Sequence, residues 1–191
     1  MMSYFLIIIG AIFVNNVVLA QFLGICPFLG VSKRISTGVG MTGAVAFVMV
    51  IATIVTFFIQ NLILIPFGIT FLQTISFILV VASLVQLVEI VLKKISPPLY
   101  QALGVFLPLI TTNCAILGVA IMSVGNEYNM VEAVVFSMAS AVGFGIALIS
   151  FAGIREQLDL MDIPEGMQGA PVALVVAGIL ALAFMGFAGM V

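Results

Sequence analysis

Charged residues are so few and so clustered in this 191-residue chain that most of the chain is too apolar to be exposed to water. Only 6% of the residues are charged and 64% are hydrophobic, whereas a soluble domain needs polar side chains across its surface. A membrane-spanning helix needs about 20 mostly apolar residues. The pattern therefore predicts an all-α, polytopic membrane protein. The windows without any charge are 1–32, 35–88, 95–126, 133–154 and 166–191.

Six spans fit these windows, because the window 35–88 is long enough for two of them. The predicted spans are 4–25, 39–60, 71–92, 100–122, 131–151 and 171–190.

The basic residues all fall in loops on one side of this arrangement. Lys33 and Arg34 follow the first span, Lys93 and Lys94 follow the third, and Arg155 follows the fifth. The loops on the opposite side carry no Lys or Arg. Basic loops are retained in the cytoplasm, so we expect both termini to lie outside.

A short phrase containing the only two cysteines occurs twice. Cys26–Val31 and Cys114–Val119 both read C-x-x-L-G-V. The tetrapeptide LVVA likewise occurs twice, at Leu79–Ala82 and at Leu174–Ala177. A unit of three spans that is repeated once must insert the second copy upside down. The sequence therefore predicts two inverted three-helix repeats, residues 1–97 and 98–191, as in many transport proteins.

The first and fourth spans contain residues that interrupt a helix. Proline and glycine open the backbone hydrogen-bond ladder, and amide or hydroxyl side chains can satisfy what is opened. Broken helices at matching positions of two inverted halves point to a site near the membrane midplane. The alternative is that small and polar residues only pack helices together. The interrupting residues are Asn15, Asn16, Gln21, Gly24, Pro27 and Gly30 in the first span, and Gly104, Pro108, Thr111, Thr112, Asn113 and Gly118 in the fourth.

The two cysteines are candidate metal ligands. A membrane-embedded cysteine is often a small apolar filler, and a disulfide would need an oxidising side and close Cα atoms. As thiolates, Cys26 and Cys114 would suit an iron–sulfur cluster, zinc or copper(I). Such sites take four ligands, and the chain contains no histidine. The missing ligands would therefore come from a second polypeptide.

The acidic residues have simpler explanations. Glu89 precedes Lys93 by four residues, so an ion pair near the cytoplasmic edge is favoured over a role in ion passage. The acidic segment 156–165 reads as a solvated loop that docks a partner. No phosphate-binding loop or dinucleotide fingerprint is present, and no basic surface suits a nucleic acid.

Several long segments match a known family. They are FLGICPFLGVSK (22–33), PPLY (97–100), GVFLPLITTNC (104–114), AGIRE (152–156) and AFMGF (183–187). Over nearly its full length the chain resembles the A subunit of the Rnf complex, a bacterial and archaeal membrane assembly.

The resemblance implies a membrane subunit of an ion-translocating ferredoxin:NAD+ oxidoreductase, with no complete active site on this chain. In that family the A subunit pairs with the similar E subunit of opposite topology. The pair is thought to hold one [2Fe-2S] cluster, with two cysteines from each chain. Carried over, the ligands here are Cys26 and Cys114. Electron transfer is coupled to Na+ or H+ transport, the other partners are the B, C, D and G subunits, and the location is the bacterial inner membrane.

Three other interpretations remain open from the residues alone. The E subunit of the sodium-pumping NADH:quinone reductase shares much of the pattern, although Pro27, Gly30 and Thr112 are closer to the Rnf version. A small secondary transporter with inverted repeats would use the broken helices for a solute and the cysteines for packing. In an assembly scaffold, the two cysteines would have no functional role.

Overall fold

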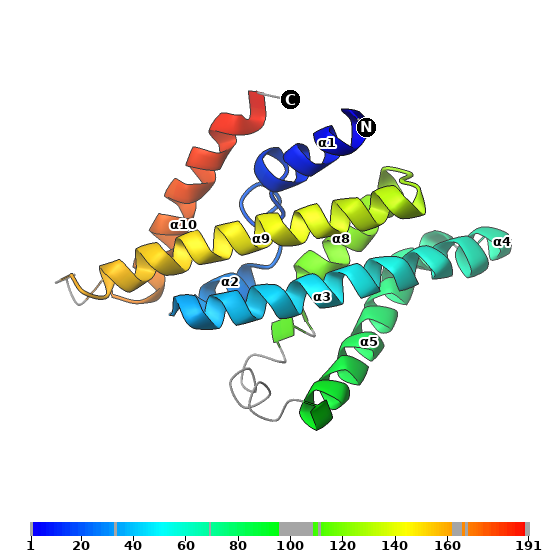
Figure 1. Ribbon diagram of the computed structural model, residues 1–191, viewed down its shortest axis with the longest axis horizontal. Helices are drawn as coiled ribbons and strands as arrows, with labels where there is room; N and C mark the ends of the chain where they lie inside the picture. The colour runs from blue at the N-terminus through cyan, green and yellow to red at the C-terminus, as the bar shows by residue number, and fades with distance from the viewer. Residues whose placement is uncertain are drawn as a thin grey trace.

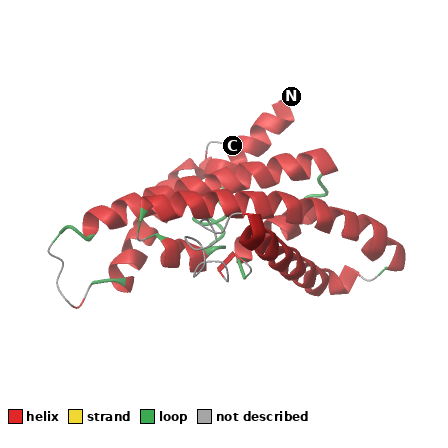
Figure 2. Cartoon of the chain, turned by 60° about the horizontal axis from the view of Figure 1, so that its bottom comes forward, coloured by secondary structure: helices red, strands yellow, loops and turns green. Residues whose placement is uncertain are grey.

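The computed structural model describes residues 2–32, 34–68, 70–95, 109–110, 112–161, 166 and 168–189. Throughout these residues the elements are helices joined by loops, and no strand occurs (Figure 2). The elements are α1 (Met2–Ile9), η1 (Gly10–Val14), α2 (Ile25–Val31), α3 (Ile35–Ile59), η2 (Gln60–Leu64), α4 (Ile65–Phe67), η3 (Thr70–Leu72), α5 (Gln73–Ile95), α8 (Cys114–Gly125), α9 (Met130–Leu158), α10 (Ala170–Met185) and η5 (Gly186–Gly189).

The helices confirm the all-α, polytopic membrane class. In the described part of the chain, three continuous helical stretches are long and apolar enough to cross a membrane: Ile35–Phe67, Gln73–Val91 and Met130–Leu158. Tyr4–Val14, Cys114–Gly125 and Ala170–Met185 are shorter apolar helices. The arrangement as six spans in two inverted repeats stays a prediction. Residues 100–108 of the fourth predicted span and the predicted 97/98 boundary lie outside the described residues.

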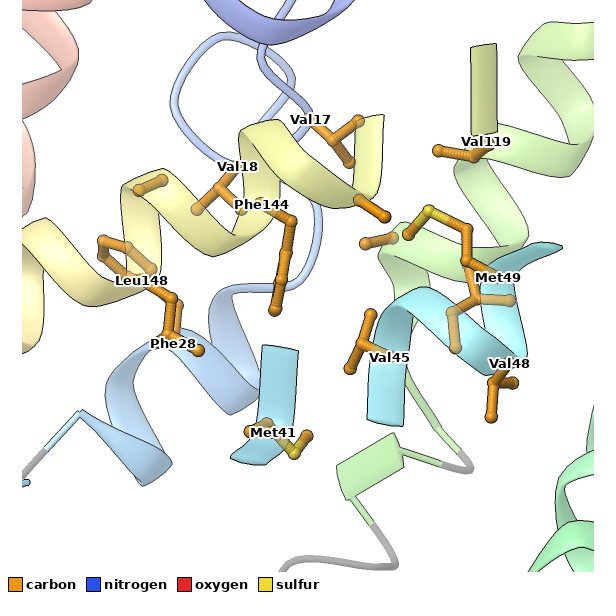
Figure 3. Packing of buried hydrophobic residues seen from close by; sticks show 14 of the residues in the cluster. Val17, Val18, Phe28, Met41, Val45, Val48, Met49, Val119, Phe144 and Leu148 are labelled. Carbon is orange, nitrogen blue, oxygen red and sulfur yellow. The ribbon is translucent and has the colours of Figure 1, made fainter. Parts of the chain in front are cut away.

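The centre of the fold is the antiparallel pair of α3 and α9, which lie side by side along most of their length (Figure 1). The two backbones approach closely because Gly145 faces Thr42, whose methyl group would collide with any Cβ at that position. Small residues allow this kind of contact between membrane helices. Phe144 and Leu148 of α9 are completely buried against neighbouring helices (Figure 3).

Helix α2 packs against the end of α9 that is predicted to lie on the cytoplasmic side. The rings of Phe28 and Phe151 stack with centroids 4.2 Å apart. The Arg155 guanidinium donates to the Leu29 carbonyl at 2.8 Å and to the Ser32 hydroxyl at 3.0 Å. A cation that bonds the last carbonyls of a helix stabilises its C-terminus. Arg155 thus fixes the short helix that carries Cys26.

Helix α9 is longer than the sequence indicates. It continues to Leu158, whereas the predicted span ended at residue 151. Glu156 therefore belongs to the helix, and the prediction of a loop over the whole of 156–165 is wrong at its start. In these last turns Arg155 has partners on α2 and Glu156 is exposed. Residues 162–165 lie outside the described residues.

Candidate functional site

The first predicted span is broken, as expected. After η1 the chain leaves helical geometry near Asn15 and re-enters it at Ile25, where α2 starts. Two residues within this break have positive φ angles, Phe22 at 55° and Gly24 at 78°. The break places the start of α2 inside the bundle, beside α8 and α9 (Figure 1).

Asn16 supplies the hydrogen bonds that the break removes. Its side chain is fully buried, and its amide nitrogen donates to the carbonyls of Ile12, at 3.0 Å, and Gly143, at 2.9 Å. Its amide oxygen accepts from the backbone N–H groups of Val18 and Leu19. All four hydrogen-bonding positions of the amide are used. The interrupted backbone is therefore satisfied by protein, as an apolar membrane requires.

Each cysteine lies in the first turn of a short helix. Cys26 is the second residue of α2 and is exposed. Cys114 is the first residue of α8 and is half-buried, and the two thiols are not joined in a disulfide. Both C-x-x-L-G-V phrases thus lie at the start of a helix, with Cys26 one residue further into its helix than Cys114. The repeat itself stays a prediction.

Gly24 joins the two cysteine segments. Its backbone N–H donates to the sulfur of Cys114 at 3.0 Å. A Cβ at Gly24 would lie 3.1 Å from both the Ala115 Cβ and the Phe144 ring, and 3.3 Å from the Asn113 side-chain oxygen. With φ at +78°, this position suits glycine for two separate reasons. The close approach brings the start of α2 onto the start of α8.

Asn113 caps α8 and keeps one donor unused. Its side-chain oxygen accepts the backbone N–H of Ala115 at 3.0 Å, which fixes the orientation of the amide. The residue is only 3% exposed, and its side-chain nitrogen has no hydrogen-bond partner among the described residues. A buried donor without an acceptor is uncommon in native structures and calls for an explanation. Here it lies next to Cys114.

The residues at this site carry donors of the kind that a thiolate metal centre would use. The two cysteines are soft donors, the Gly24 backbone N–H donates to the Cys114 sulfur, and the neighbouring residue Asn113 has a buried amide nitrogen without a partner among the described residues. Among the described residues, no group of three His, Cys, Asp or Glu side chains gathers as a metal site. Two thiols are half of the ligands that a four-cysteine cluster would need, and Cys26 is exposed.

Not every residue that the sequence singled out lies at this site. Asn15 is exposed and lines a cavity of about 280 Å³ together with Asn126 and Tyr128. This cavity lies at the C-terminal end of α8, whereas Cys114 is at the N-terminal end. Thr112 lies in the turn directly before Asn113. Asn113 directly precedes Cys114 at the start of α8, whereas Asn16 satisfies the broken backbone, and Thr111 lies outside the described residues.

Two contributions to the site were not predicted. Gly24 was expected to break the helix, but nothing in the sequence indicated that its N–H would bind Cys114. Arg155 was counted only as a cytoplasmic charge, although it caps the cysteine helix. A basic residue directly after a long apolar span was the available signal, but its partner lies 126 residues away.

The sequence matches a family of membrane proteins over almost its whole length. A family model described as "Rnf-Nqr subunit, membrane protein" matches residues 4–191. The chain is 56% identical, over 189 residues, to the A subunit of the Na(+)-translocating ferredoxin:NAD(+) oxidoreductase complex of Acetobacterium woodii, covering 99% of this chain and 98% of the relative.

Two further relatives carry a shorter name, the A subunit of an ion-translocating oxidoreductase complex. The protein of Syntrophotalea carbinolica is 56% identical over 191 residues, which is 100% of this chain and 99% of the relative. A protein of Vibrio cholerae is 47% identical over 191 residues, with the same coverage.

Proposed function

Because this chain belongs to the Rnf-Nqr family of membrane subunits, we propose that it is the A subunit of an ion-translocating ferredoxin:NAD+ oxidoreductase, the Rnf complex. In this role it carries electrons across the membrane through a [2Fe-2S] cluster, and the electron transfer is coupled to Na+ or H+ transport. Cys26 and Cys114 are the ligands from this chain. The other two come from a homologous subunit of opposite topology, the E subunit, within an assembly that also contains the B, C, D and G subunits.

The observation that carries the proposal is the pairing of the two cysteine segments. Gly24 and Cys114 lie 90 positions apart in the chain, and the hydrogen bond from the Gly24 N–H to the Cys114 sulfur joins the segments that carry the two cysteines. Packing alone does not require two thiols at matching helix starts. The unused donor of Asn113 also fits a ligand that carries negatively charged sulfur.

Each residue at the site has a separate task in this proposal. Cys26 and Cys114 bind iron as thiolates, and the cluster supplies one-electron transfer when bound. The Gly24 N–H and the Asn113 amide lower the energy of added negative charge beside Cys114. Asn16 and Arg155 hold the helix starts in place, Asn16 through the break and Arg155 through the end of α2. A change of charge at the two cysteines acts on the broken backbone between η1 and α2. This effect is our proposed link between electron transfer and ion access.

The proposed location is the bacterial inner membrane, with the basic loops in the cytoplasm and both termini outside. Arg34 precedes α3 and Arg155 lies near the end of α9, so both occupy the same end of the α3–α9 pair (left in Figure 1). Lys93 and Lys94 occupy the last turn of α5. This distribution supports the orientation that the loops predict.

Iron content and the EPR spectrum of the anaerobically purified complex test the ligand assignment. In a Cys26→Ser variant we expect the loss of one reduced [2Fe-2S] signal and of about two irons per complex, because a hydroxyl is a poor substitute for a soft thiolate ligand. Cys26 is exposed, so the substitution leaves the packing of this chain unchanged. An unchanged spectrum and iron count would leave Cys26 as a packing residue and would favour a transporter or a scaffold.

Replacement of Asn113 tests the role of its unused amide donor. Asn113→Ser keeps an oxygen that caps α8 but removes the NH2 group, whereas Asn113→Leu removes both. In both variants we expect the cluster midpoint potential to fall by tens of millivolts, because a hydrogen bond of about 1 kcal/mol no longer favours the reduced form and 59 mV is a factor of ten for one electron.

A redox titration followed by EPR measures this potential. The serine variant is the decisive one, since its helix cap is retained. If the leucine variant shifts the potential and the serine variant does not, the cap rather than the donor is responsible.

A further inference from the structure

Helix α5 is the least covered of the long apolar helices. Only 17% of its apolar window is buried, against 39% for Ile35–Phe67 and 61% for Met130–Leu158. It packs on α3 and α8 through one face, which contains the buried side chains Phe77, Val81 and Val85. Its opposite face points away from the bundle (Figure 1). Among the described residues, none covers this outward face of α5.

Gln86 lies at the centre of that outward face. A period of 3.6 residues places it in line with Leu79 and beside Ile90, which are 65% and 63% exposed. Gln86 is also exposed, and its side chain makes no hydrogen bond to another described residue. Two donor hydrogens and an acceptor oxygen are thus offered to the surroundings.

The position of Gln86 along α5 is well inside the membrane. Seven residues separate it from Lys93, which corresponds to about 10 Å along a helix. The hydrocarbon core is about 30 Å thick, and Lys93 belongs to the basic group at its cytoplasmic edge. A side chain at this depth has no headgroup or bulk water to bind.

Two other exposed surfaces of the apolar helices do not raise the same problem. Ser83 of α5 is exposed, but its hydroxyl donates to the Leu79 carbonyl of the same helix at 2.9 Å. The outward face of α10 presents apolar side chains, which suit lipid. They are Leu174, Val175, Ile179 and Leu182. An amide in lipid would leave its hydrogen-bonding groups unsatisfied, so the Gln86 face favours protein over lipid.

We propose that the face of α5 centred on Gln86 docks a transmembrane helix from a different subunit, which presents a serine, threonine, asparagine or glutamine to the amide. Ala82 and Ser83 are small and flank Gln86, so a second helix backbone has room to approach. The proposal requires only that the chain works in a multi-subunit membrane assembly. It does not depend on the cluster at Cys26 and Cys114.

Site-specific photo-crosslinking in membranes that contain the whole complex tests this surface. Benzoylphenylalanine is placed at Leu79 or at Ile90, which flank Gln86 on the same face and leave the amide in place. The matched control carries the probe at Ile179 of α10, which is 62% exposed within an apolar face. After irradiation we expect a discrete adduct between this chain and another subunit from the α5 positions, and none from α10.

The remaining outcomes contradict the proposal. Lipid adducts alone from α5, adducts with a second copy of this chain, or equal adducts with one subunit from α5 and α10 would each overturn it. As a second measurement, Gln86→Leu should reduce retention of the crosslinked subunit during purification by about threefold, a typical effect of one interhelical hydrogen bond. Gln86→Asn, which keeps an amide, should retain more of that subunit than Gln86→Leu. Equal retention in the native, leucine and asparagine forms would remove Gln86 from the interface.

Discussion

Replacing Cys114 with serine is expected to abolish electron-coupled ion transport while the chain still folds and assembles. Serine keeps an acceptor for the Gly24 N–H, so the contact between the two helix starts is preserved. What it removes is the soft sulfur that an iron–sulfur cluster needs. The loss should exceed the roughly 10–100-fold effect of removing an outer-shell partner, because a ligand itself is lost.

The measurement is ferredoxin-dependent uptake of Na+ or H+ by proteoliposomes that contain the purified complex. The composition of the complex on a native gel is the control for assembly, and Cys114→Ala is the second variant, because it neither binds iron nor accepts the Gly24 hydrogen bond. Both variants should lose transport, and only the alanine variant should also loosen the α2–α8 contact. Transport in the serine variant close to the native rate would exclude Cys114 as a ligand.

A valine at position 24 is expected to destabilise the protein strongly and to separate the two cysteine segments. The left-handed backbone there costs a non-glycine residue about 1–2 kcal/mol. The 3.1 Å approach of a Cβ to Ala115 and Phe144 adds an overpacking cost of about 1–3 kcal/mol. Valine has two further methyl groups, so the Gly24 N–H should move away from the Cys114 sulfur.

Thermal unfolding in detergent, with iron content in parallel, measures both consequences of the valine. The matched control is Gly68→Val, because Gly68 also has a positive φ of 66°, but a Cβ added there would have no heavy atom within 4 Å. Gly68→Val therefore reports backbone strain without a clash. Equal losses of stability in the two variants, with iron retained in both, would mean that the packing of Gly24 against α8 has no importance.

Much of this architecture could be predicted because membrane helices have a strong local signal. A charge-free window of about 20 residues leaves a chain few choices other than a spanning helix, since lipid satisfies no backbone hydrogen bond. This is why the helices α3, α5, α9 and α10 occur where apolar windows predicted them. The break in the first span was also predictable, because Gly24 favours a left-handed turn and Pro27 is tolerated only in the first turn of the helix that follows.

The partners of the polar groups in the break were not predictable in the same way. Asn15 and Asn16 are adjacent and chemically identical, yet one is exposed and the other makes four hydrogen bonds. The difference depends on Gly143, which lies 127 residues from Asn16 and approaches it closely across α9. No local pattern carries that information, so the different positions of Asn15 and Asn16 could not be predicted from the sequence.

By itself, the sequence determined the class of the protein, its family, and the two thiols in matching phrases, because composition and motifs are properties of residues and their neighbours. Only the tertiary structure decided that the Gly24 N–H meets the Cys114 sulfur, that Asn113 keeps an unused donor beside it, and that Gln86 faces outward. Each of these depends on how helices far apart in the chain pack against one another. Helix packing is set by the shapes of whole faces, which arise only when the helices have come together.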